Sequence, residues 1–459
     1  MREIGITVLP EFFQNEGVEG VLDNLARAGA TAIATSPYVM APEAEGRGSR
    51  EPPIDGGPGK VRLLDRPLWG RRELWVRTAP SFAPDRALYE GLRYRPAEPD
   101  DLTAKEGETV ARALGAAKAR GLTVHLQVQA AIPPGYRVQF GGPGEEDRPR
   151  LPDGASPTGR VDNNGSLASP HILAYTQALL RDLARAYPDI DAIRIDWPEY
   201  PPYSLESLFF DFSDHALSAM RDLGFDPERA RRDVGWLRRE GLPALLAADP
   251  GDGYALVRAL AARPGVLDWL RAKAAIVTRF VAACADTLRE ETGGRIALFP
   301  QAFPPPWSLL SGFDYRAVGA LGVPGIGVKL YTMHWPMMLR AYGDALRAAY
   351  PDLPEPGPAL ARLFDTADGH GAPLAQVRYP EPDEPHPVGL EAQKRKIRAA
   401  QAESGVPVHA FAHGYGPVED VARRAQAAFE AAGGRLWMNR YGYLSDRKLD
   451  AIGRIGRGA

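Results

Sequence analysis

Short runs rich in β-branched residues alternate along the chain with longer segments whose apolar residues recur at helical spacing. The short runs predict eight strands, at Ile4–Leu9, Ala32–Thr35, Thr123–Val128, Ala192–Asp196, Arg295–Phe299, Gly327–Tyr331, Pro407–Ala412 and Arg435–Asn439. The amphipathic segments predict helices, at Val18–Ala28, Glu106–Ala119, Pro170–Tyr187, Leu267–Glu291, Gly389–Glu403, Pro417–Ala432 and Ser445–Ile455. This alternation predicts a parallel sheet covered by helices.

Eight strand–helix units in series are the number that closes a (β/α)8 barrel. A doubly wound open sheet is the competing fold, and it often carries a glycine-rich, phosphate-binding turn after its first strand. The corresponding turn in this chain, Pro10–Asn15, contains no glycine. The sequence therefore predicts an α/β fold of the TIM-barrel class, with residues 1–459 forming a single barrel.

Three long segments interrupt the alternation, at residues 38–101, 201–264 and 333–385. They follow the second, fourth and sixth predicted strands. Residues 201–264 have helical spacing and predict a helical insertion, whereas the other two segments predict long loops. Because all three follow strands, we expect them over the C-terminal face of the barrel, where this fold keeps its active sites.

Composition and charge narrow the class of protein. The chain is 44% hydrophobic and 25% charged with a formal net charge of −3, and its charges are interspersed, so no basic surface for nucleic acid or membrane is expected. The one cysteine, Cys284, allows no disulfide within the chain and permits a reducing compartment. A strand predicted almost at the first residue leaves no room for an export signal. We therefore predict a cytoplasmic protein, and the sequence leaves its oligomeric state open.

Aromatic rings and neutral hydrogen-bonding groups recur where the predicted strands end, whereas carboxylates are scarce there. Apolar sugar faces stack on Trp and Tyr, and sugar hydroxyls pair with amides and imidazoles, so this composition is typical of a carbohydrate pocket. Plain packing at the mouth of the barrel is the alternative for part of the set. The predicted substrate-binding residues are Tyr38, Gln127, Trp197, Tyr200, Gln301, Trp307, Lys329, His334, Trp335, Tyr379, His413 and Asn439.

The most specific signal lies at the end of the fourth predicted strand. Side chains alternate along a strand, so Arg194 and Asp196 share one face, and a guanidinium there favours the ionised carboxylate. Glu199 follows Trp197-Pro198 in a partly apolar surrounding that would raise its pKa. One charged and one protonated carboxyl group form the pair that hydrolyses a glycosidic bond. The alternative is an Arg194–Asp196 pair that braces the barrel, with Glu199 on a surface loop.

The segment Tyr187–Asp196 resembles the fourth strand of TIM-barrel glycoside hydrolases of the α-amylase type and of related hydrolase-like barrels. In those proteins an arginine stands two residues before the catalytic aspartate. The segment Asn439–Tyr443, followed by a helix, is also similar to hydrolase-like barrels. The resemblance covers about Ser166–Tyr203, and it implies a glycosidase whose catalytic aspartate is Asp196.

The chain departs from these families in its second carboxyl group. A glutamate is missing after the fifth predicted strand, where Gln301 stands, and after the seventh, where His413 stands. The proton donor therefore cannot be transferred from the resemblance. The candidates, in order of preference, are Glu199, then Asp383 or Glu384, and then Glu11.

The sequence thus predicts a glycoside hydrolase that acts on a small saccharide without a cofactor or a metal. A metal-dependent sugar isomerase, epimerase or lyase is the first rival, with His125, Asp196, His334 and His413 as candidate ligands whose convergence the spacing leaves open. The second rival is a barrel without catalytic activity that binds carbohydrate or a protein partner.

Overall fold

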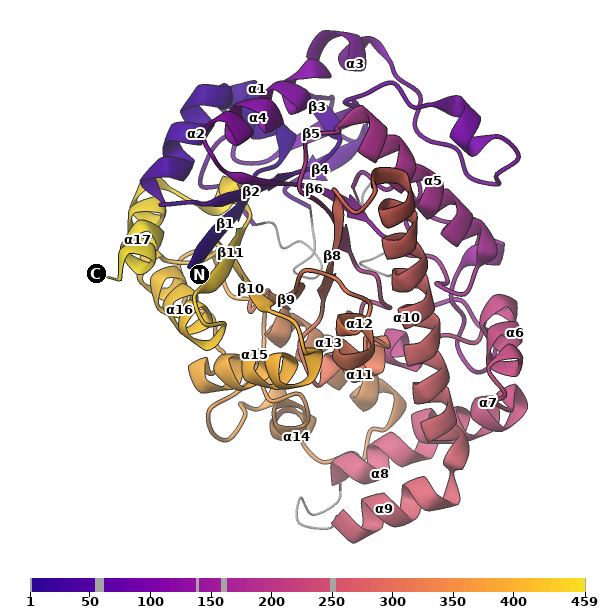
Figure 1. Ribbon diagram of the computed structural model, residues 1–459. Coiled ribbons are helices and arrows are strands. Elements are labelled where there is room, and N and C mark those ends of the chain that lie inside the picture. Colours follow the sequence, from indigo (N-terminus) through magenta and orange to yellow (C-terminus); the bar gives the residue numbers. More distant parts are fainter. Residues whose placement is uncertain (1, 54–61, 138–139, 158–162, 248–252, 459) are drawn as a thin grey trace.

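The computed structural model describes residues 2–53, 62–137, 140–157, 163–247 and 253–458. Eight parallel strands close into a barrel in the order β1-β11-β10-β9-β8-β7-β6-β2 (Figure 1), which confirms the predicted fold class. The strands are β1 (Glu3–Thr7), β2 (Ala32–Thr35), β6 (Thr123–Gln129), β7 (Ala192–Asp196), β8 (Ala297–Ala302), β9 (Ile326–Leu330), β10 (Val408–His413) and β11 (Arg435–Asn439).

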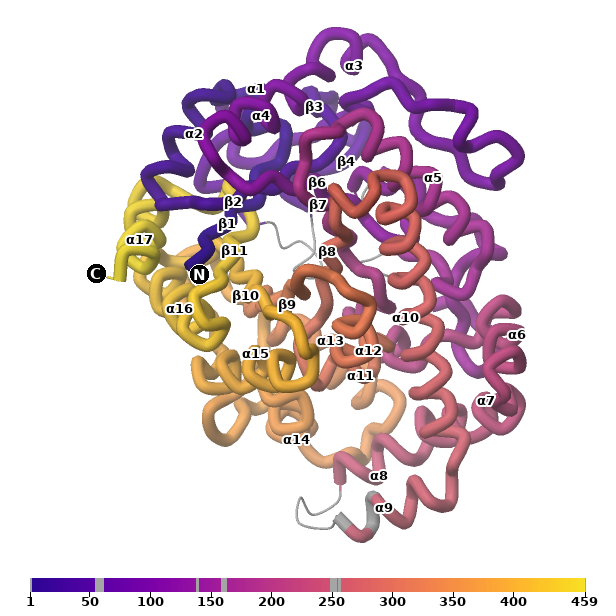
Figure 2. The backbone as a smooth tube through the Cα atoms, in the orientation of Figure 1, coloured from indigo at the N-terminus to yellow at the C-terminus, as the bar shows by residue number. Residues whose placement is uncertain are grey.

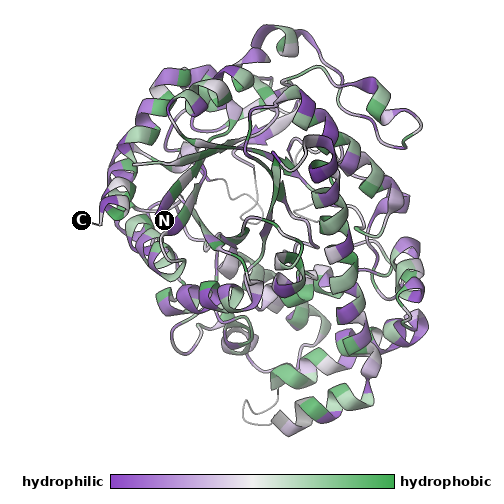
Figure 3. Cartoon of the chain, in the orientation of Figure 1, coloured by the Kyte–Doolittle hydropathy of each residue, from purple (hydrophilic) through white to green (hydrophobic). Residues whose placement is uncertain are grey.

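Helices surround the barrel and carry their polar faces outward (Figure 3). Those that follow the barrel strands are α1 (Pro10–Glu16), α2 (Val18–Arg27), α3 (Asp101–Glu106), α4 (Glu108–Ala119), α5 (Pro170–Ala186), α10 (Pro264–Thr292), α11 (Trp307–Ser311), α12 (Tyr315–Gly319), α15 (Leu390–Ser404), α16 (Val418–Ala431) and α17 (Asp446–Arg457). The helix α5 illustrates how the sequence sets an end: Pro170 opens it, and the Ser169 side chain accepts hydrogen bonds from two backbone N–H groups of its first turn.

Predicted and observed strand limits agree for β2, β7 and β11, whereas β8 begins two residues later than predicted. Gly293 and Gly294 end α10 with positive φ, and the N–H of Arg295 still bonds back to the Thr292 carbonyl. The parallel ladder therefore starts only at Ala297, whose N–H bonds to the Asp191 carbonyl.

Large rings fill the interior of the barrel. Trp437 and Phe411 are fully buried, and their rings stack with a centroid separation of 5.8 Å. A Cβ atom at Gly5 would lie 2.0 Å from the Trp437 ring, and one at Gly327 would lie 2.5 Å from the Phe411 ring. Glycine on β1 and β9 therefore makes room for these rings, and close packing shuts the barrel below its C-terminal end.

The three long segments after β2, β7 and β9 carry secondary structure of their own. Within the described part of 38–101, three strands form a small antiparallel sheet in the order β3-β5-β4, namely β3 (Tyr38–Pro42), β4 (Ser49–Glu51) and β5 (Leu74–Pro80). The segment after β7 carries α6 (Asp214–Asp222), α7 (Pro227–Trp236), α8 (Leu242–Ala247) and α9 (Gly253–Ala262), and the one after β9 carries α13 (His334–Ala349) and α14 (Pro356–Leu363).

The two ends of the described chain lie on the same side of the barrel, near β1 and α17 (Figure 2). Arg2 donates a hydrogen bond to the Gly456 carbonyl at 3.2 Å. Within the described ranges, every helix is too short or too polar to cross a lipid bilayer.

Candidate active site

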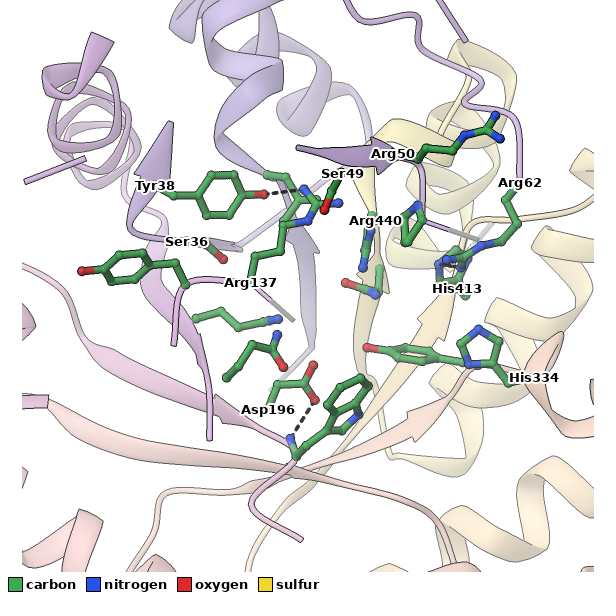
Figure 4. A pocket seen from close by; sticks show the side chains of 18 of the residues that line it. Ser36, Tyr38, Ser49, Arg50, Arg62, Arg137, Asp196, His334, His413 and Arg440 are labelled. Atoms are coloured by element: carbon green, nitrogen blue, oxygen red, sulfur yellow. Dashed lines mark hydrogen bonds between the residues drawn. The ribbon is translucent and has the colours of Figure 1, made fainter. Parts of the chain in front are cut away.

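A cavity of about 370 Å³ opens at the C-terminal ends of the barrel strands. Strand ends and the residues just after them contribute polar groups to its wall, the small sheet contributes part of its mouth, and loops complete it (Figure 4). Its polar lining residues in the described chain are Ser36, Tyr38, Ser49, Arg50, Arg62, Gln127, Gln129, Tyr136, Arg137, Asp196, Tyr203, Tyr331, His334, His413, Asn439 and Arg440.

Asp196 ends β7, where the ladder pairs it with Gln129 on β6 and Gln301 on β8. Its Oδ1 accepts a hydrogen bond from the Trp197 N–H at 3.1 Å and lies 3.2 Å from the Lys329 Nζ. Trp197 adopts a φ of 56°, an unfavourable conformation for a bulky residue, at the turn that follows the strand. Asp196 is therefore held through one oxygen at the floor of the cavity.

Glu199 lies behind this floor, fully buried and outside the cavity lining. Its Oε1 accepts a hydrogen bond from the Phe303 N–H at 2.8 Å, its Oε2 accepts one from the Ser311 hydroxyl at 2.6 Å, and Lys329 lies 3.2 Å from Oε1. Burial raises the pKa of Glu199 above its ordinary value, and Lys329 and the two hydrogen bonds offset only part of that rise. The two predicted carboxylates thus meet at one ammonium group, but Asp196 alone faces the cavity.

Arg194 occupies the barrel interior beneath Asp196. Its Nε donates to His125 Nδ1 and its Nη1 donates to the Thr7 hydroxyl, both at 3.2 Å, and its guanidinium lies 3.5 Å from the centroid of the Trp437 ring. Burial lowers the pKa of Arg194 to about 9, which still leaves it charged at neutral pH. The cation in contact with Asp196 is therefore Lys329, in place of the predicted Arg194.

Half of the predicted substrate-binding residues line the cavity: Tyr38, Gln127, Trp197, His334, His413 and Asn439. The other half lie outside its lining: Tyr200, Gln301, Trp307, Lys329, Trp335 and Tyr379. Gln301 is fully buried and its Nε2 donates to the side-chain Oε1 of Gln127 at 3.1 Å, so it orients a residue that does line the cavity.

The predicted ring platforms outside the lining are covered by other side chains. Trp307 stacks on Phe364 with a centroid distance of 5.2 Å, and Trp335 packs against Trp307 at 5.7 Å. The Tyr200 hydroxyl donates to Asp211 at 3.0 Å, and Tyr379 is 5% exposed. These rings lie among packed side chains because the segments after β7, β8 and β9 fold onto one another here.

The remaining candidate proton donors also lie outside the lining. Glu11 is fully buried, and its oxygens accept hydrogen bonds from Arg137 at 3.2 Å and from the Tyr38 hydroxyl at 3.1 Å. Asp383 is exposed, and Glu384 pairs with an arginine of its own loop. Asp196 is thus the only carboxylate among the cavity-lining residues that the structure describes.

Sequence reasoning did not select the arginines of the cavity. Arg137 and Arg62 come from loops, and Arg440 follows β11 directly. Arg137 forms buried ion pairs with Glu11 and with Glu51, which comes from β4. Only the place of Arg440 at a strand end was visible in the sequence, because the loops approach the barrel through contacts between residues far apart in the chain.

Three of the four candidate metal ligands of the rival hypothesis, Asp196, His334 and His413, line the cavity. His125 lies apart from them, in the barrel interior beside Arg194. Across the described parts of the chain, no group of three or more His, Cys, Asp or Glu side chains is arranged to hold a metal ion.

Fold and cavity together define a TIM barrel with a polar site at its C-terminal face. No family model matches the sequence, and no curated protein matches it. Among solved structures, the catalytic domain of a β-amylase from Paenibacillus polymyxa matches with a TM-score of 0.51 at 12% identity, over 99% of this chain and 96% of that one. A β-galactosidase from Marinomonas ef1 matches with a TM-score of 0.50 at 12% identity.

The β-galactosidase match covers 96% of this chain and 54% of that chain, so this chain spans about half the length of that enzyme. These neighbours are glycoside hydrolases with a TIM barrel, and the fold is what this chain shares with them. At such low identity the likeness assigns no residue a role.

Proposed function

We propose that the chain is a glycoside-hydrolase-type enzyme that acts on a small saccharide or glycoside, with Asp196 as the carboxylate that meets the substrate. The observation that carries the proposal is the placement of Asp196, the one carboxylate among the described cavity-lining residues, at the end of a barrel strand. Lys329 and the Trp197 N–H hold its Oδ1, and none of the described residues donates to its Oδ2. A fixed carboxylate with one open oxygen suits attack on, or charge stabilisation at, an anomeric carbon.

The cavity suits a small saccharide in size and lining. Its volume of about 370 Å³ falls within the range of about 300–1,000 Å³ that is usual for small-molecule sites. Gln127 and Asn439 offer amide groups to hydroxyls, and the rings of Trp197 and Tyr203, 5.7 Å apart, offer apolar surface to a sugar face.

Glu199 acts in this proposal through Lys329, as a positioning residue. Its carboxylate fixes the ammonium group that in turn contacts Asp196. Protonation of a leaving group by Glu199 would require its hydrogen bonds with Phe303 and Ser311 to break. Aryl glycosides need little protonation as they leave, so they test Asp196 separately from the proton donor.

The test compares the wild type with Asp196→Asn on a panel of aryl glycosides. We expect kcat/KM to fall by at least about a hundredfold, because loss of a group that acts on the reacting atoms costs about 10²-fold or more. Asp286→Asn, at an exposed carboxylate on α10, is the matched control and should keep wild-type activity. Hydrolysis that survives Asp196→Asn undiminished would overturn the assignment. Saccharide binding by a wild type that hydrolyses no glycoside would instead favour the rival of a barrel without catalytic activity.

A further inference from the structure

The cavity carries more cationic than anionic side chains. Its described lining includes four arginines, namely Arg50, Arg62, Arg137 and Arg440, whereas Asp196 is the only lining carboxylate there. Lys329, at 3.2 Å from Asp196, already matches that carboxylate at the floor. A cationic side chain in a cavity wall attracts anions to the extent that nearby carboxylates leave its charge uncompensated.

Two of these arginines are matched by carboxylates that lie outside the lining. Arg137 is 6% exposed in its side chain and forms ion pairs with Glu11 and Glu51, which are both buried. Arg50 pairs with Glu73 at the more exposed edge of the small sheet. These arginines shape the cavity while their charges are already compensated.

Arg440 stands apart from them. Among the described carboxylates, the one that pairs with it is Glu51, whose Oε1 lies 3.9 Å from its Nη1, beyond hydrogen-bond distance. Glu51 is already bonded to Arg137. The Nη1 of Arg440 is buried and donates to none of the described residues. A buried donor without an acceptor costs free energy, which an acceptor on a bound ligand would recover.

The cavity wall beside Arg440 also presents neutral polar groups. Burial, followed by the charges of Arg62 and Arg440, holds the pKa of His413 well below its ordinary value, so this imidazole is uncharged at neutral pH. Asn439 and Tyr331 complete this side of the wall. Figure 4 draws Arg440 across the open space of the cavity from Asp196. A ligand between them could place one end at the carboxylate and the other at the guanidinium.

We propose that the substrate is an anionic saccharide whose oxyanion group is bound by Arg440. The oxyanion is the carboxylate of a uronic acid or the phosphate or sulfate ester of a sugar, since a guanidinium presents paired N–H donors to all three. This inference rests on the proposed function for the saccharide part of the ligand. The anion site itself rests on Arg440, whose buried Nη1 has no acceptor among the described residues.

The test is direct binding, which needs no turnover. Calorimetric titration of the wild type compares neutral glucose and galactose with their uronic acids, 6-phosphates and 6-sulfates, and with inorganic phosphate alone. We expect at least one charged form to bind about tenfold or more tightly than its neutral parent, and the preference to weaken as salt is added. The charged form that binds best identifies the source of the oxyanion.

Arg440→Gln should bring the charged and neutral forms to within about threefold of each other, because it removes the charge and the paired donors. Arg440→Lys keeps the charge without the planar fork, and should keep part of the preference. Arg289→Gln, at an exposed arginine on α10, is the matched control and should bind as the wild type does. A thermal unfolding curve confirms that each variant is folded.

The outcomes separate this inference from the proposed function. Neutral sugars that bind as tightly as charged ones, or a preference that survives Arg440→Gln in folded protein, would overturn the anionic substrate even if Asp196 proves catalytic. Conversely, phosphate binding that depends on Arg440, in a wild type that hydrolyses no glycoside, would support the anion site and remove the proposed function.

Discussion

Lys329 contacts two carboxylates that differ in what else touches them. Glu199 uses both of its oxygens in hydrogen bonds with Phe303 and Ser311, whereas none of the described residues bonds to the second oxygen of Asp196. A carboxylate whose two oxygens are both hydrogen-bonded inside the protein positions other side chains. A carboxylate with one oxygen free of such bonds can contact a substrate. At the scale of single residues, Asp196 and Glu199 therefore differ in the contacts that their oxygens can offer to a substrate.

Replacing Glu199 by Gln tests this inequality. The amide keeps the size of the side chain and an acceptor for the Phe303 N–H, so we expect kcat/KM to fall by less than the ~10²-fold that loss of a general acid costs. The basic limb of the pH–rate profile should also stay in place. The measurement is kcat/KM from about pH 4 to pH 9 on paired aryl and alkyl glycosides. A variant that keeps aryl activity but loses alkyl activity would identify Glu199 as the proton donor after all.

The place of Asp196 could be predicted from local pattern alone, because strand periodicity and the fold class together send its side chain to the cavity. The contact with Lys329 could not, since the two residues lie 133 positions apart in the chain. With that contact hidden, strand periodicity led to the expectation that Arg194 lies beside Asp196. Arg194 does share the inward face of the strand with Asp196. Its guanidinium nevertheless lies deeper in the barrel interior, where it stacks on Trp437 and donates to His125.

At the scale of elements, the small sheet β3-β5-β4 shapes the mouth of the cavity. It contributes Tyr38 and Arg50 to the lining, and it holds Glu51 against Arg137. The sequence predicted a long loop there, because its proline and glycine residues hide the short strands. The barrel strands were easier to predict, since each is a short, mostly buried run beside a helical segment.

Two glutamates of this region form arginine pairs that differ in burial, and they make a matched comparison. Glu51 and Arg137 are nearly inaccessible, whereas Glu73 is 44% exposed in its pair with Arg50. We expect Glu51→Ala to lower the free energy of unfolding by about 3 kcal/mol, near the lower end for a broken buried pair because Glu11 still contacts Arg137. Glu73→Ala should cost less than about 1 kcal/mol. Urea unfolding measures both, and equal losses would contradict the assigned difference.

At the scale of the whole molecule, closure of the barrel follows from the number of strand–helix units, which the sequence shows. The charge of the cavity does not, because Arg62, Arg137 and Arg440 come from segments that meet only in the folded chain. Two buried lysines bind other segments that meet only in the folded chain, namely those after β7, β8 and β9. Lys273 on α10 donates to the carbonyls of Leu208 and Leu310, and Lys396 on α15 donates to those of Pro305 and Phe364.

These lysines give the stability of the fold a predictable pH dependence. Burial lowers the pKa of Lys273 and that of Lys396 to about 7 each, whereas an unfolded lysine titrates near about 10.4. Between these values the unfolded chain binds more protons, so each lysine makes the free energy of unfolding rise with pH, by up to about 1.4 kcal/mol per pH unit. Below pH 7 both states are protonated and this contribution is flat.

Lys273→Met should therefore flatten the rise in unfolding free energy between about pH 7 and pH 9 relative to the wild type, by up to the ~1.4 kcal/mol per pH unit of one lysine. The variant also loses the hydrogen bonds to Leu208 and Leu310, which shifts its stability at every pH, so the slope rather than the offset carries the test. Lys105→Met, at a side chain that is 78% exposed, is the matched control and should keep the wild-type slope. Urea unfolding at half-unit pH steps gives the three slopes, and equal slopes for the wild type and Lys273→Met would show that Lys273 titrates alike in the folded and unfolded chains.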